Sequence, residues 1–134
     1  MRNFAMKDSV LPPETEAVIT RVIGCAIRVH AALGPGFLES IYSNALAIEL
    51  EVMNIPFERE KSIVVSYRGL PVAAQRLDFV VADKVILEIK AAARLEPIFQ
   101  AKVISYLRAT TLRVGLLMNF NVLLLKDGIK RIVL

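Results

Sequence analysis

The stretch LDFVVADKVILEIKA, residues 77–91, constrains the fold more than any other because it places charges within two apolar strands. Asp78 stands just before the first apolar run, and Glu88 and Lys90 interrupt the second. A carboxylate that is buried without a partner destabilises a fold, so these charges need partners within the structure. The pattern predicts two strands joined by a tight turn around Asp83 and Lys84.

The length of that turn decides which charges lie together. Glu88 and Lys90 are two residues apart on one strand and therefore share a face. A two-residue loop would pair Asp78 with Ile89 and send Glu88 to the opposite face. A three-residue loop over 82–84 would pair Asp78 directly with Glu88, because a slip of one residue reverses every side chain. We predict the three-residue loop or an equivalent bulge.

Two carboxylates and an ammonium on one face form a site for a hard cation, with a catalytic base or charge stabiliser beside it. Oxygen ligands suit Mg²⁺, which keeps bound waters and also binds phosphates. The spacing leaves a second interpretation open. Glu88 and Lys90 would then form a solvated strand face, and Asp78 would pair with Arg76 alone.

Hydrophobic periodicity and turn residues predict the remaining elements. The order is α-α-β-β-β-α-β-β, an α/β or α+β sandwich with a mixed sheet flanked by helices. The predicted elements beyond the central hairpin are a helix from Pro12-Pro13 to Leu33, a helix from about Phe37 to Met53, a strand from Lys61 to Tyr67 with its return from Leu70, a helix over 97–109, a buried strand in LRVGLLMNF, and a last hairpin in VLLLKDGIKRIVL with an Asp-Gly turn.

The totals bound the class of protein. A chain of 134 residues suits one domain, here 12–134 after a flexible arm over 1–11. The single cysteine, Cys25, excludes an internal disulfide and a cysteine-based zinc site. No apolar run reaches the roughly 18 residues that cross a bilayer, and no signal peptide is visible, so we expect a cytoplasmic protein without membrane contact.

Charge and apolar content suggest partners only weakly. A net charge of +4 is compatible with a polyanion such as nucleic acid. The apolar content of 55% indicates a homo-oligomer, with a dimer as the simplest form.

A second segment, GPGFLESIY over 34–42, carries an acid at the start of a helix. Glu39 there is explained either by the positive end of the helix dipole, worth about 0.3–1 kcal/mol, or by a role in a site. Tyr42 lies one turn further along the same helix face. It either contacts a phosphate or orients Glu39, or it is a packed tyrosine with a bonded hydroxyl.

These segments together resemble a known family. Gly36, Glu39 and Tyr42 fit a Gly-x-x-Glu-x-x-Tyr pattern, and Asp78 with Glu88-x-Lys90 fits the catalytic signature of the PD-(D/E)xK nuclease superfamily. The small bacterial and archaeal proteins called GxxExxY proteins carry both, and the resemblance extends from about Ile19 to Phe120.

The resemblance implies a restriction-endonuclease-like core with its site at a split in the sheet, which Glu39 would face from its helix. It also implies a metal-dependent nuclease that cleaves phosphodiester bonds of DNA or RNA with Mg²⁺, for which Mn²⁺ can substitute. The implied catalytic residues are Glu39, Asp78, Glu88 and Lys90. The implied metal ligands are Asp78, Glu88, Glu39 and the main-chain carbonyl of Ile89. The residues expected to contact nucleic acid are Tyr42, Arg76, Arg94 and Lys102.

The chain departs from the family pattern in two places. Leu77 stands where the superfamily often has a proline before the aspartate. In the helix that follows Lys90, Phe99 and Lys102 occupy the usual histidine and glutamine positions. Two alternatives therefore stay open: a catalytically impaired nucleic-acid-binding module on a nuclease scaffold, and a protein-interaction or assembly module.

Overall fold

The computed structural model describes residues 10–134. The predicted flexible arm over 1–11 therefore lies almost wholly outside the described residues, and Leu11 at its end is buried in the core. The elements are α1 (Pro13–Leu33), α2 (Glu39–Val52), β1 (Phe57–Tyr67), β2 (Leu70–Val81), β3 (Val85–Lys90), α3 (Pro97–Ala109), β4 (Val114–Asn119), the 3₁₀ helix η1 (Leu125–Gly128) and β5 (Ile129–Val133). The predicted order is confirmed.

The strands form one mixed five-stranded sheet in the order β1-β2-β3-β4-β5. β3 and β4 run parallel, and every other neighbouring pair is antiparallel. The parallel pair requires a crossover, and α3 supplies it. Both β3 and β4 are almost wholly buried, as expected for central strands covered on both faces.

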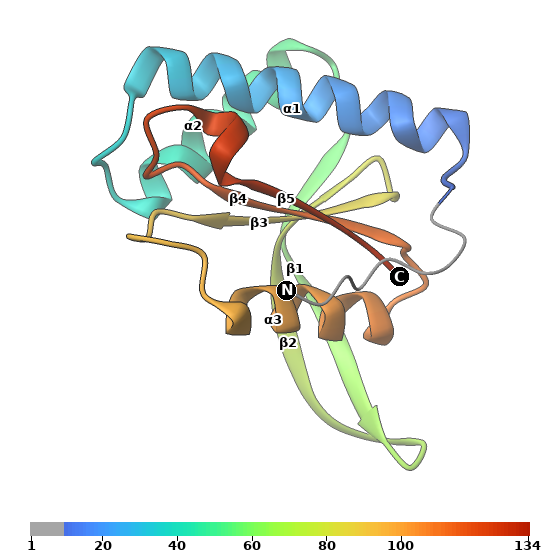
Figure 1. The fold of residues 1–134 in the computed structure, drawn as a ribbon. Coiled ribbons are helices and arrows are strands. Elements are labelled where there is room, and N and C mark those ends of the chain that lie inside the picture. Colours follow the sequence, from blue (N-terminus) through green and yellow to red (C-terminus); the bar gives the residue numbers. More distant parts are fainter. Residues whose placement is uncertain (1–9) are drawn as a thin grey trace.

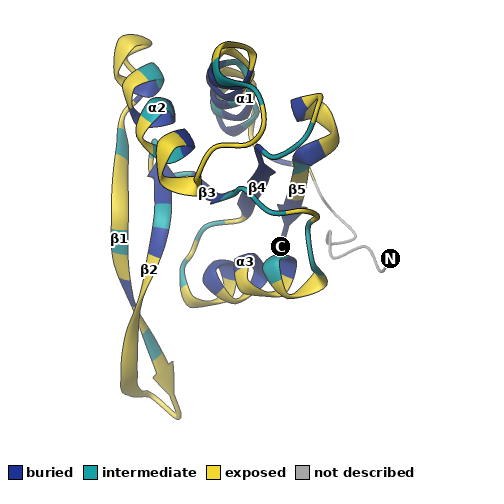
Figure 2. Ribbon diagram, turned by 90° about the vertical axis from the view of Figure 1, so that its left-hand side faces the viewer, coloured by how far each residue is buried: buried dark blue, intermediate teal, exposed yellow. Residues whose placement is uncertain are grey.

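Helices cover the two faces of the sheet (Figures 1 and 2). α1 and α2 pack on one face, where their buried residues join Phe79, Leu87 and Leu116 in one core. α3 packs on the other face, where Val103 and Leu107 meet Ile86 in a second core. The sheet therefore separates two hydrophobic layers.

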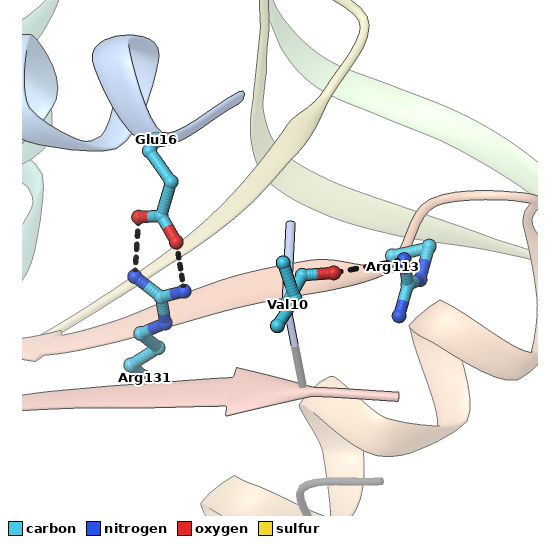
Figure 3. Close-up of polar contacts among 4 residues, drawn as sticks. All are labelled: Val10, Glu16, Arg113 and Arg131. Atoms are coloured by element: carbon cyan, nitrogen blue, oxygen red, sulfur yellow. Dashed lines mark hydrogen bonds and ion pairs between the residues drawn. The ribbon is translucent and has the colours of Figure 1, made fainter. Parts of the chain in front are cut away.

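An ion pair connects the start of α1 to the last strand. The two terminal guanidinium nitrogens of Arg131, Nη1 and Nη2, donate to the carboxylate of Glu16, at 2.7 and 2.6 Å (Figure 3). Beside it, Arg113 donates to the main-chain oxygen of Val10 at 3.3 Å. These contacts fix the first described residues against β4 and β5. Within residues 10–134, no helix combines the length and the apolar character needed to cross a bilayer.

The predicted C-terminal hairpin is wrong. Residues 121–124 form bends rather than a strand, and β5 pairs with β4 instead. An Asp-Gly hairpin turn needs a glycine with positive φ, but Gly128 is not among the glycines that have one. Gly128 ends η1 against the main chain of Asn119, where an added Cβ would lie 2.1 Å from the carbonyl oxygen. Close packing, and not turn geometry, selects this glycine.

A second glycine sets the distance between α3 and the sheet. A Cβ built on Gly115 of β4 would lie 2.5 Å from Cγ1 of Val103. We predict that Gly115→Ala lowers the free energy of unfolding by about 1–3 kcal/mol, because α3 must shift outward. The control is Gly24→Ala within α1, where the added Cβ would lie 3.7 Å from the guanidinium of Arg28.

In that control, the substitution should raise the free energy of unfolding by about 0.5–1 kcal/mol. Urea unfolding of both variants measures the two effects. If Gly115→Ala and Gly24→Ala changed the free energy of unfolding in the same direction and by the same amount, the packing argument would be contradicted.

Candidate active site at the split between β2 and β3

The turn between β2 and β3 has the predicted three-residue length, which the register confirms. Residues 82–84 form the turn, and the pairs run from Val81↔Val85 to Phe79↔Leu87. Ala82 and Asp83 both have positive φ, at 53° and 54°, which closes the turn tightly. Continuing this register by one step brings Asp78 opposite Glu88.

At that step β2 and β3 separate, and hydrogen bonds to the two carboxylates replace the main-chain hydrogen bonds of the ladder. Oδ2 of Asp78 accepts a hydrogen bond from the main-chain N–H of Ile89 at 2.8 Å. In return, Oε1 of Glu88 accepts one from the N–H of Asp78 at 3.3 Å. Each acid thus binds the opposite strand, and both carboxylates are held at the same point in the sheet.

The ladder on the other side of β2 breaks at the same place. β1 pairs with β2 at Arg59↔Phe79 and again at Lys61↔Leu77, while Glu60 between them has a φ of 49°. Residues two apart on a regular strand share a face. Here Leu77 joins the core under α3, whereas Phe79 joins the core under α1 and α2. β2 therefore changes faces at Asp78.

Glu88 is only 5% exposed. Burial raises its pKa to about 7, with the charge of Asp78 as the next cause. The hydrogen bond from Asp78 and the charges of Lys90 and Lys102 oppose that rise. A carboxyl with this pKa exchanges protons near neutrality, which is unusual for glutamate and common in functional sites.

Lys90 lies on the α3 side of the sheet. Its Nζ is 4.7 Å from the centroid of the Phe99 ring, a cation–π contact that fixes the ammonium near Glu88. Phe99 occupies the position where the family pattern has histidine, so this substitution supplies an aromatic face for the lysine. From the sequence alone, Phe99 is a departure from the family pattern, and its contact with Lys90 carries no sequence signal.

The N-terminal turn of α2 presents Glu39 to the same site. Gly34 and Gly36, with φ of 70° and 106°, direct the chain into the helix, and Glu39 is its first residue. Partial burial of the carboxyl raises the pKa of Glu39, although the residue as a whole is exposed. Lys90 lowers that pKa, Asp78 raises it and Lys102 lowers it. Glu39 therefore faces the same group of charges.

Tyr42 is a packed tyrosine. Its hydroxyl donates to the carbonyl of Gly34 at 2.6 Å and accepts the N–H of Phe37 at 3.1 Å. Its ring is fully buried and stacks on Phe120 with centroids 4.8 Å apart. The structure therefore supports the interpretation of Tyr42 as a packed tyrosine with a bonded hydroxyl. The predicted phosphate contact of Tyr42 is wrong, because its side chain is buried. Tyr42 closes the turn that places Glu39.

The three predicted cations have different surroundings. Lys102 on α3 is exposed and acts on the pKa of both Glu39 and Glu88, so it borders the site. Arg94 donates to Glu96 at 2.8 Å, and Arg76 is 3.8 Å from Glu60 on the β1–β2 ribbon. The structure therefore groups Lys102 with the carboxylates and gives the two arginines acidic partners of their own.

Two further residues complete the site. Tyr106, one helical turn after Lys102, is 4% exposed, and burial raises its pKa, followed by the charges of Glu88 and Asp78. Its i, i+4 spacing from Lys102 was the available signal. Asn119 is 2% exposed and binds both the N–H and the carbonyl of Ala92 at 3.0 Å, which holds the chain just after Lys90. In the sequence, Asn119 is visible only as a polar residue within the predicted buried strand LRVGLLMNF.

The donor set fits a metal held by few protein ligands. Within the described part of the chain, no group of three or more histidine, cysteine or acidic side chains is close enough to hold an ion. Mg²⁺ is commonly bound by one or two carboxylates, with waters and substrate phosphates completing its shell. Asp78 and Glu88 supply such a pair of oxygen ligands, and the charge of Asp78 is, after burial, the second cause of the raised pKa of Glu88.

Comparison with known proteins gives one match. The sequence model of a family described as the PD-(D/E)XK nuclease superfamily matches residues 16–132. No curated protein and no solved structure matches the chain.

The pKa of Glu88 predicts a dependence of stability on pH in metal-free protein. Unfolded glutamate titrates near 4.5, whereas folded Glu88 titrates at about 7. Between these values the folded state holds a proton that the unfolded state has lost, so stability falls as pH rises and levels off above 7. At pH 8, Glu88→Gln should therefore be more stable than the parent by on the order of 2–3 kcal/mol.

At pH 4.5 that difference should nearly vanish. Denaturant unfolding in chelator at both pH values measures it, with the exposed Glu51→Gln as the control. A Glu88→Gln effect that is the same at both pH values would contradict the assignment of the shift to Glu88.

Proposed function

This chain belongs to the PD-(D/E)XK nuclease superfamily, and from that premise we propose that it is a metal-dependent nuclease that cleaves phosphodiester bonds of DNA or RNA. Within the superfamily we propose kinship with the GxxExxY proteins, on the pattern of Gly36, Glu39 and Tyr42. The observation that carries the activity is the reciprocal contact of Asp78 and Glu88, with Lys90 held beside it.

Asp78 and Glu88 would hold Mg²⁺ or Mn²⁺, with the carbonyl of Ile89 as an additional oxygen ligand. When bound, the cation supplies Lewis-acid activation of water and offsets charge on the scissile phosphate. The N–H groups of Asp78 and Ile89 already orient the two carboxylates, so little rearrangement is needed. Glu39 would extend the acidic surface, directly or through water.

Lys90 would orient the attacking water or stabilise charge that develops on the phosphate. The ring of Phe99 limits where its ammonium can lie, which favours one orientation. Lys102 would contact a neighbouring phosphate, as would Arg94 and Arg76 further away. Such contacts position the nucleic-acid backbone without reading its sequence.

A second function is favoured by the helix after Lys90. Phe99 and Lys102 replace two polar residues of the family pattern with a ring and a cation, which strengthens phosphate binding but removes uncharged donors and acceptors. The alternative is a nucleic-acid-binding module without turnover. It predicts affinity that falls with salt and no cleavage with Mg²⁺ or Mn²⁺.

We predict that metal binding and cleavage separate in two variants. Asp78→Asn should lose Mn²⁺ binding in calorimetry and all cleavage, because one carboxylate of the pair is gone. Lys90→Ala should keep Mn²⁺ binding and lose cleavage by at least about 100-fold, since removal of a charge-stabilising group typically costs that much. Unfolding midpoints of both variants control for loss of structure.

Two results would contradict this proposal. Retained metal-dependent cleavage in both purified variants would remove the site from the reaction. Salt-dependent binding by the parent protein without cleavage would support the binding module instead.

Lys102 provides a test of substrate contact. Lys102 borders the carboxylates and forms no ion pair of its own within residues 10–134, so Lys102→Ala should weaken nucleic-acid binding and reduce the salt slope by about one. Arg28→Ala is the matched control, since Arg28 of α1 is already paired with Glu49 and lies outside the proposed phosphate contacts. Titrations at several salt concentrations measure both, and equal effects would place the phosphates elsewhere.

A further inference from the structure

β1 and β2 extend beyond the sheet as a two-stranded ribbon, here called the distal ribbon (residues 62–76). Figure 1 shows it passing α3 and ending in free space, and Figure 2 shows that most of it is exposed. Val64, Leu70 and Val72 are exposed at 60%, 69% and 64%. An isolated two-stranded hairpin is marginally stable in water, so apolar residues along such a ribbon indicate a missing cover.

The two edges of the distal ribbon differ in their protection. On β2, Pro71 lacks an N–H, and the register shifts by one residue between Val65 and Ser66, which leaves Val72 as the extra residue. Proline and bulges are the usual means of blocking a strand edge. On β1, pairing runs regularly from Ser62↔Arg76 to Val65↔Ala73. The edge over 62–67 therefore keeps its main chain free to pair.

We propose that this edge of β1 pairs antiparallel with the same edge of a second copy, about a twofold axis at Val64. The sequence Ser-Ile-Val-Val-Ser over 62–66 is close to a palindrome, so antiparallel pairing matches like with like. In this register Ser62 faces Ser66 of the partner subunit, and Ile63 faces Val65 of the partner subunit. At the axis, Val64 faces Val64 of the partner subunit. Such cross-strand pairs stabilise sheets, and a twofold interface is self-complementary by necessity.

Opposite charges flank the edge, although Glu60 and Arg68, with φ of 49° and 54°, lie outside its regular strand pairing. Antiparallel pairing of the edges brings the Glu60 end of one copy beside the Arg68 end of its partner, and the symmetry repeats this approach. Within one copy, Glu60 has only a 3.8 Å contact with Arg76, between two largely exposed side chains. Arg68, at the tip of the ribbon, forms no ion pair in the described part of the chain. The dimer therefore supplies each with an opposite charge.

A second copy fits this edge better than nucleic acid does. Residues 62–67 of the edge carry no cation, and among the described residues Arg108 of α3 is the one cation that lines the hollow beside Val64 and Ser66, whereas binding of a nucleic-acid backbone depends on several lysines and arginines. Valine and isoleucine with free main-chain groups are instead what a further strand requires. Six residues from each copy form a small interface, so a dissociation constant on the order of micromolar is expected.

Sedimentation of the full chain over a range of concentrations tests the dimer. The parent should associate reversibly, and Val64→Lys should raise the dissociation constant at least tenfold because two like charges meet at the axis. Val72→Lys, equally exposed but on the blocked strand, should leave it unchanged. A parent that stays monomeric at all concentrations overturns the proposal, as do equal effects of the two lysines.

Two further variants test the register. Val64→Cys, in a Cys25→Ala background, should form an intermolecular disulfide, because directly opposed strand residues lie within disulfide reach. Val72→Cys should not. Glu60→Arg should weaken the dimer, and adding Arg68→Glu should restore it. If substitutions in the distal ribbon changed the nucleic-acid affinity of a protein that stays monomeric, the proposal would be overturned in favour of a substrate contact.

Discussion

The site depends on one departure from regular sheet geometry, the replacement of ladder bonds by two acidic side chains at Asp78 and Glu88. A continued ladder would join the main chains of β2 and β3 and leave no room for carboxylates between them. Here each carboxylate accepts a main-chain N–H from the opposite strand. The same bonds that end the ladder therefore fix the acids, and no buried side-chain nitrogen or oxygen of the described residues lacks a hydrogen-bond partner.

Charge balance explains the composition around this pair. Burial raises the pKa of Glu88, the charge of Asp78 adds to that rise, and Glu39 places a third acid beside the same charges. Lys90 and Lys102 oppose that accumulation from β3 and α3. The ring of Phe99 also favours a cation, so Phe99 and Lys102 act in the same sense: α3 supplies a positive charge and an aromatic support for Lys90. A divalent ion would offset the remaining negative charge of the carboxylates.

Much of this arrangement could be predicted from sequence because it depends on short-range rules. The side-chain alternation of strands fixed the three-residue turn once Asp78 and Glu88 had to meet, and proline and glycine located the helices. The failures depend on contacts distant in sequence. Gly128 is selected by the main chain of Asn119, and Tyr106 becomes part of the site only because α3 crosses beneath β3. No local pattern contains those distances.

The break at Glu60 and Asp78 has a second consequence for the molecule. Because β2 changes faces there, the strand beyond it leaves β3 and continues with β1 alone as the distal ribbon. One irregularity thus both brings the two acids together and releases the ribbon. If two copies join through that ribbon, each site is attached to the other through a continuous β structure. The separation of the two sites is then set by the length of the ribbon, which makes the ribbon a determinant of how the pair would engage a long polymer substrate.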